Sequence, residues 1–145
     1  MDSGDENLSN LLNNLQPNLL NEDYVFITLE DYSFDFSNLL NPIATFKEEE
    51  GLTLVISEER AKRENFEYNS VFKCISLGVH SSLNSVGLIA TISTLLSEKG
   101  ISCNVFSGYF HDHLFVQKSL SKDCLLYTSD AADEGLGVDL GGRRI

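Results

Sequence analysis

The sequence has few basic residues. Ten Lys and Arg stand against 22 Asp and Glu, which gives a formal net charge of −12 at pH 7. Binding to nucleic-acid phosphates or to an anionic membrane surface requires clustered Lys and Arg. No apolar run approaches the ~20 residues that span a bilayer, and residues 1–10 lack the basic region and apolar stretch of a secretory signal. The composition therefore predicts a cytoplasmic protein with no nucleic-acid and no membrane partner.

Cysteine is also scarce. Cys74, Cys103 and Cys124 are odd in number, widely spaced and without a CxxC pair, which indicates free thiols in a reducing compartment. Hydrophobic residues make up 42% of the chain and charged residues 22%, as in globular proteins. A chain of 145 residues can form one ordinary domain or two very small domains that share a core.

The first half of the chain alternates helical and extended patterns. Leucines recur at helical spacing until Pro17 interrupts them, and a run of aromatic and β-branched residues follows. Two further apolar runs flank the acidic turn at Gly51, and Ser57 precedes Glu58 and Glu59 as a helix N-cap would. The pattern predicts a helical segment within residues 8–20 that is broken at Pro17, strands over 24–30, 43–47 and 52–56, and a helix after Ser57.

The second half predicts a strand, a helix and two strands. Residues 71–79 alternate as a half-buried strand does. A helix over residues 85–99 would be capped by Ser82 or Asn84 and would end at Gly100, and strands follow over 101–109 and 113–116. This order predicts an α+β fold in which an antiparallel sheet is layered with helices on one face.

Residues 124–145 do not continue this pattern. They show little periodicity and no apolar face, so they predict no further helix or strand. The segment resembles the translation of a transposase-type sequencing adapter, since CLLYTSDAAD and VDLGGRRI are the peptides that such an adapter encodes. We therefore expect residues 124–145 to be a non-native tail and the second module to lack its last helix and strand.

The group His111-Asp112-His113 allows three interpretations: a metal site, a catalytic group or the start of a buried strand. Two histidines at this spacing share one face of a strand and can bind one ion. No His or Cys cluster at motif spacing supplies the remaining ligands, although His80 and Cys74 are candidates. Ser81 and Ser82 lie near a histidine but outside any GxSxG motif, and serines before a helix are more often caps.

A third candidate is a ligand site at the loop before the helix at 85–99. The N-terminus of a helix presents unpaired N–H groups and a partial positive charge to a carboxylate or phosphate. Gly87 lies in this first turn and would allow a ligand to approach closely. Gly87 would equally allow the helix to pack closely on the sheet, and spacing alone does not distinguish the two explanations.

Three motifs resemble the ACT-domain family of small regulatory modules: HSSL-x-x-VG, the EEEGLTL run, and the DHLFV strand. The resemblance covers residues 8–120 and extends to aspartate kinase regulatory modules and cellular amino-acid sensors. It implies tandem ferredoxin-like βαββαβ modules, with a first module that includes an N-terminal helix at residues 8–68 and a truncated second module at 69–123. The strand at DHLFV would turn Asp112, Leu114 and Val116 toward the helices and the histidines away.

The resemblance also implies a function. It predicts a regulatory protein that binds an amino acid or a similar small effector, with no catalytic activity, no metal and no cofactor. The alternatives are an interaction module that forms a homodimer through its sheet edges without a ligand, and a metal-dependent enzyme that uses His111 and His113. The residues that the family pattern assigns to the ligand are His80, Ser81, Ser82, Val86, Gly87, Leu88, Asn104, Tyr109 and Asp112.

Overall fold

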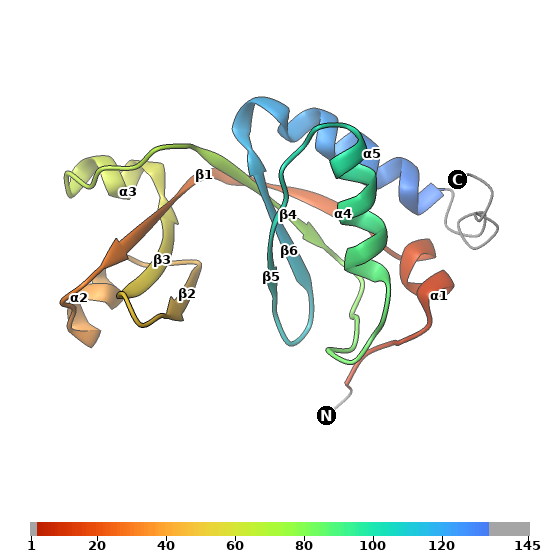
Figure 1. Cartoon of the computed structure of the whole chain (residues 1–145), viewed down its shortest axis with the longest axis horizontal. Helices are drawn as coiled ribbons and strands as arrows, with labels where there is room; N and C mark the ends of the chain where they lie inside the picture. Colours follow the sequence, from red (N-terminus) through yellow and green to blue (C-terminus); the bar gives the residue numbers. More distant parts are fainter. Residues whose placement is uncertain (1–2, 134–145) are drawn as a thin grey trace. The chain divides into compact units, whose positions relative to one another are not determined.

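A computed structural model describes residues 3–133 of the chain (Figure 1). This part contains six strands in the hydrogen-bonded order β2-β3-β1-β4-β6-β5 and confirms the predicted α+β class with antiparallel pairing and helices. The elements are α1 (Leu8–Asn13), β1 (Pro17–Leu29), α2 (Phe34–Leu39), β2 (Ala44–Lys47), β3 (Leu52–Ser57), α3 (Glu58–Arg63), β4 (Phe72–Leu77), α4 (Leu88–Glu98), β5 (Asn104–Ser107), β6 (Asp112–Gln117), a short 3₁₀ helix (Lys118–Leu120) and α5 (Ser121–Asp133).

The chain divides into two compact units, of which residues 21–73 form the central unit. Here β3 pairs with β1 and β2, and Val25 and Ile27 lie opposite Ile56 and Leu54. Opposed residues of an antiparallel pair share a face, so these four side chains form one apolar surface, which Leu40 covers. The predicted strands at 43–47 and 52–56 are thereby confirmed.

The predicted N-cap at Ser57 is also confirmed. Its Oγ accepts a hydrogen bond from the backbone N–H of Arg60 at 3.1 Å, which satisfies one of the N–H groups that a helix start leaves without a partner. Glu58 and Glu59 occupy the first turn of α3, where the helix dipole favours carboxylates. Ala61 is fully buried in the core of the central unit.

The composite unit combines the two ends of the chain, residues 3–20 and 74–133. Its core cluster includes Leu11 and Leu12 of α1, Ile75 and Leu77 of β4, Leu88, Ile92 and Leu96 of α4, Leu114 and Val116 of β6, and Cys124 and Ala131 of α5. The N-terminal helix therefore packs with the second module, although the sequence grouped it with the first. The helix ends at Asn13, before the predicted break at Pro17, and Pro17 begins β1.

The expectation that no helix follows β6 is wrong. Residues 121–133 form α5, in which Cys124, Thr128 and Ala131 are buried, and burial raises the pKa of the Cys124 thiol to about 12. These positions have the spacing i, i+4 and i+7 of a helix face. Two of them are small and one is a threonine, so the face was not recognisable by hydrophobicity.

A strand from the N-terminal part of the chain lies beside β4. The first residues of β1, Pro17 to Leu20, belong to the composite unit, where β1 is the neighbour of β4. The N–H of Gly78, directly after β4, donates to the carbonyl oxygens of Leu15 and Gln16 at 2.8 and 3.1 Å.

The adapter origin proposed for residues 124–145 concerns their source and stays a prediction. Residues 134–145 lie outside the described part.

Of the helices among residues 3–133, none combines the length and the apolar character that crossing a membrane requires.

Candidate ligand site

The loop before α4 differs from the predicted helix start. The helix begins at Leu88, and Gly87 is its N-cap, with φ +104° and no side-chain hydrogen bond to the first turn. Ser82 does not cap α4: its Oγ accepts from the N–H of Asn84 at 3.0 Å, and its carbonyl accepts from Ser85 at 3.0 Å. This local turn holds residues 82–85 outside the helix, as Ser side chains often do.

Ser81 and Asp112 are brought together by this loop. The Ser81 hydroxyl donates to Oδ2 of Asp112 at 3.1 Å, and the two residues are only 5% and 7% exposed. Asp112 begins β6 and lies on the same face as Leu114 and Val116, which pack into the core with the helices. The predicted orientation of the strand is confirmed. A buried carboxylate thus lies against the loop that leads into α4.

The N-terminal residues lie along the same loop, an arrangement that could not be predicted from the sequence. The N–H of Asp5 donates to His80 O at 2.9 Å, and the N–H of Ser82 donates to Asp5 O at 2.8 Å, so Asp5 forms a parallel bridge with Ser81. The Ser82 hydroxyl also donates to the carboxylate of Glu6 at 3.3 Å. No local pattern links residues so distant in the chain.

Aromatic rings adjoin the loop from the turn between β5 and β6. The ring of His80 lies 5.0 Å from that of Phe110 and 6.2 Å from that of Tyr109, between centroids. Tyr109 was predicted and Phe110 was not. The two rings also contact each other edge to face at 5.1 Å, so the turn presents them as one aromatic group.

Of three other predicted residues, Asn104 lies away from Asp112, whereas Val86 precedes α4 and Leu88 begins it. Asn104 pairs opposite Phe115, whereas Asp112 pairs opposite Ser107; the three intervening steps of strand separate them by about 10 Å. Val86 is 83% exposed, and Leu88 is a core residue at 2%.

Gly87 contacts another part of the protein. A Cβ at this position would lie 3.3 Å from a methyl group of Leu8, and φ +104° is a conformation that residues other than glycine rarely adopt. Gly87 therefore allows close packing, although against Leu8 of α1 and not against the sheet as the sequence suggested. Close approach of a ligand to Gly87 stays a prediction.

The two histidines of His111-Asp112-His113 have separate partners. Nδ1 of His111 donates to Val79 O at 3.2 Å, and Nδ1 of His113 lies 2.8 Å from the hydroxyl of Ser76. Burial, and secondarily the nearby His111, lower the pKa of His113 below its ordinary value, and Asp112 opposes this. Among residues 3–133, no three or more His, Cys, Asp or Glu side chains gather closely enough to hold a metal ion.

Comparisons with known proteins agree with this fold. Residues 3–73 and residues 69–123 each match a family model described as an ACT domain. The crystal structure of VC0802 from Vibrio cholerae, described as a protein of unknown function and a possible transport protein, is 44% identical to this chain. That likeness covers 86% of this chain and 95% of the other, with a TM-score of 0.78.

Two more distant structures share the fold alone. Atu0741 from Agrobacterium tumefaciens is 17% identical over 80% of this chain and 87% of its own, with a TM-score of 0.58. Aspartate kinase from Clostridium acetobutylicum, described as an allosteric enzyme, is 14% identical over 78% of this chain and 33% of its own, with a TM-score of 0.55. No curated protein matches the chain.

Proposed function

The chain belongs to the ACT-domain family, and from this we propose that it is a regulatory protein that binds an amino acid or a similar small effector and has no catalytic activity of its own. Two ACT-domain matches together account for residues 3–123, so they leave little of the described chain for a further domain. The fold shared with aspartate kinase supports a regulatory role by analogy.

The observation that carries the proposal is the buried hydrogen bond between Ser81 and Asp112. Asp112 is an acceptor suited to the ammonium group of an amino acid. The N–H groups in the first turn of α4 lack a side-chain cap and carry the positive end of the helix dipole, which suits the carboxylate of the same ligand. The proposed site therefore rests on Ser81, Asp112 and the first turn of α4.

The other assigned residues have different roles in this proposal. His80, Ser82 and Tyr109 would border the ligand, and Gly87 would shape the loop. Val86 and Asn104 would contribute little. Because Asp5 and Glu6 hydrogen-bond to the loop, ligand binding would be coupled to the position of the N-terminal segment.

A thermal-shift screen of the twenty amino acids tests this function. A ligand that binds only the native state raises its stability with the logarithm of one plus the ratio of free ligand concentration to Kd, so the unfolding midpoint keeps rising above Kd. We expect one amino acid, or a chemically related group, to raise the midpoint in this concentration-dependent way. If no amino acid has this effect on the full chain, the proposed function is wrong.

A second candidate is an interaction module that forms a homodimer through a sheet edge. β2 is an edge strand, and its Phe46 is 65% exposed; in α2, Phe34 and Leu39 are 78% and 69% exposed. Exposed apolar side chains next to a free strand edge favour pairing with another chain. Sedimentation of wild type and Phe46→Lys distinguishes this candidate, since only an edge-mediated dimer would be lost in the variant.

A further inference from the structure

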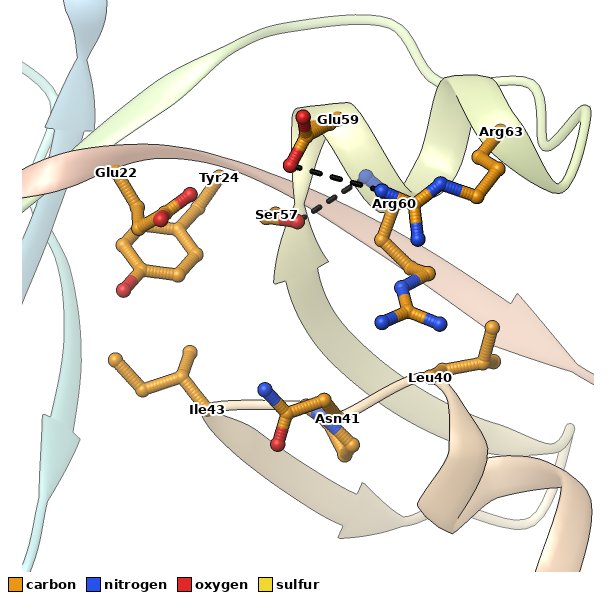
Figure 2. A pocket seen from close by; sticks show the side chains of 10 residues that line it. Glu22, Tyr24, Leu40, Asn41, Ile43, Ser57, Glu59, Arg60 and Arg63 are labelled. Atoms are coloured by element: carbon orange, nitrogen blue, oxygen red, sulfur yellow. Dashed lines mark hydrogen bonds and ion pairs between the residues drawn. The ribbon is translucent and has the colours of Figure 1, made fainter.

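A cavity of about 410 Å³ lies within the central unit. Its walls are Glu22 and Tyr24 of β1, the turn at residues 40–43 between α2 and β2, and the end of β3 together with α3 (Figure 2). Pockets for small molecules commonly measure roughly 300–1,000 Å³. All of its lining residues fall between Glu22 and Arg63, so it shares none with the loop site at Asp112.

Arg60 places a cationic group at this cavity. Its Nη1 donates to Leu39 O at 3.0 Å, which fixes the guanidinium beside the turn, where Figure 2 shows it next to Asn41. Among residues 3–133, no carboxylate lies within ion-pair distance of Arg60. A guanidinium held in place, with donors to spare, in a protein of net charge −12 is suited to a ligand carboxylate.

Glu22 supplies the opposite charge from β1, on the other side of the cavity from Arg60 in Figure 2. Within the described part of the chain, its carboxylate also forms no ion pair. The remaining charged residues of the lining are Glu59 and Arg63, which are both exposed. Oε1 of Glu59 lies 3.8 Å from Nη2 of Arg63, so their opposite charges largely cancel.

The cavity also has a smaller apolar part. Ile43 lines it and is 44% exposed, whereas Tyr24 and Leu40, which also line it, are 8% and 2% exposed. Asn41 has φ +51°, a conformation that asparagine tolerates better than most residues, and its amide can donate and accept hydrogen bonds. Two arginines and two glutamates give a lining without net charge, which fits a ligand with one charge of each sign better than a dianion.

We infer that this cavity binds a small zwitterion, whose carboxylate bonds to Arg60 and whose ammonium group pairs with Glu22. The apolar remainder of the ligand lies against Tyr24 and Ile43. This is a second site, built from other residues, and it does not depend on the loop site of the proposed function.

The test uses full-length Asp112→Asn protein, so that the loop site does not contribute. Each of the twenty L-amino acids is titrated, and the amides of Asn41 and Ile43 are followed by NMR. We expect saturable shifts with at least one amino acid, weakened tenfold or more by Arg60→Gln and by Glu22→Gln. Lys62→Gln removes a charge from the same short helix, at a side chain that is 68% exposed and does not line the cavity, and should leave affinity within twofold.

Two results would overturn the inference. One is that no amino acid shifts these amides, including the case in which wild type binds and Asp112→Asn does not. The other is that binding survives Glu22→Gln unchanged. Glu22→Gln keeps the test decisive if Arg60→Gln does not fold, because Glu22 is exposed on a strand and its replacement removes no hydrogen bond that supports the turn.

Discussion

The two units differ in the way the chain builds them. The central unit is one continuous stretch, residues 21–73, with a small core of strand residues covered by Leu40 and Ala61. The composite unit joins residues 3–20 to residues 74–133, and its larger core draws on α1, α4 and α5 as well as β4 and β6. Local patterns therefore describe the central unit well, whereas the composite unit depends on contacts between distant segments.

The largest effect is expected from removing α5 by ending the chain after Leu120. The deletion would uncover leucines of α1 and α4 and remove the buried Cys124 and Ala131. The free energy of unfolding of the composite unit should fall by about 3 kcal/mol or more, as for large losses of core packing. Urea denaturation measures this, and NMR signals of Val25 and Leu54 should show that the central unit keeps its core.

Leu126→Ala is the control for that deletion, because Leu126 lies on the same helix but is 57% exposed. It should change stability by less than about 0.5 kcal/mol. An unchanged urea midpoint after the deletion would mean that α5 contributes nothing to the fold, as the sequence predicted for residues 124–145.

An intermediate effect is expected at Gly87. Gly87→Val would force a β-branched residue into φ +104° and against Leu8, and should destabilise the composite unit by about 1–3 kcal/mol even without ligand. Gly100→Ala separates the backbone strain from the contact with Leu8. Gly100 also has a positive φ, +75°, but no atom lies within 4 Å of an added Cβ. A smaller loss for Gly87→Val than for Gly100→Ala would contradict the contact between α1 and the loop.

The smallest effect concerns pH. The folded pKa of His113 is lowered, so the unfolded chain takes up a proton first as pH falls below the ordinary value of about 6.5. The stability of the composite unit should therefore decrease from about pH 6.5 downward, toward the folded pKa. Urea titration of wild type and His113→Gln at several pH values measures this effect. The stability of wild type should fall more steeply with decreasing pH than that of His113→Gln, and the difference is the contribution of His113. An identical pH dependence in the two proteins would refute the assignment.

The same contrast explains what the sequence could predict. The hairpin of β2 and β3 and the Ser57 cap follow from short-range periodicity and capping chemistry, and the inward face of Leu114 and Val116 was expected from the family resemblance. The packing of α1 with α4 and α5 does not, because it is set by tertiary contacts between the chain ends. The buried face of α5 was not predicted because a threonine and an alanine form much of it, and neither stands out by hydrophobicity.

The candidate site divides in a similar way. Ser81 and Asp112 were named from the family resemblance, and the structure brings them together. Asp5, Glu6 and Phe110 were missed, since only the fold places them at the loop. Asn104 was named but lies at the other end of the β5–β6 pair, because the resemblance specified the strand and not the register.

Calorimetric titration of Glu22→Gln and of the double variant Asp112→Asn/Glu22→Gln, with the amino acid that gives the largest thermal shift, tests the central claim most directly. Both proteins carry Glu22→Gln, which weakens binding at the cavity beside Arg60 equally in the two, so Glu22→Gln is the matched reference for Asp112→Asn. Replacing the carboxylate by an amide keeps the shape and the hydrogen bond to Ser81 but removes the charge that pairs with an ammonium group. The account predicts at least tenfold weaker binding in the double variant than in Glu22→Gln, which corresponds to about 1.4 kcal/mol. Equal affinity in the two proteins would contradict it.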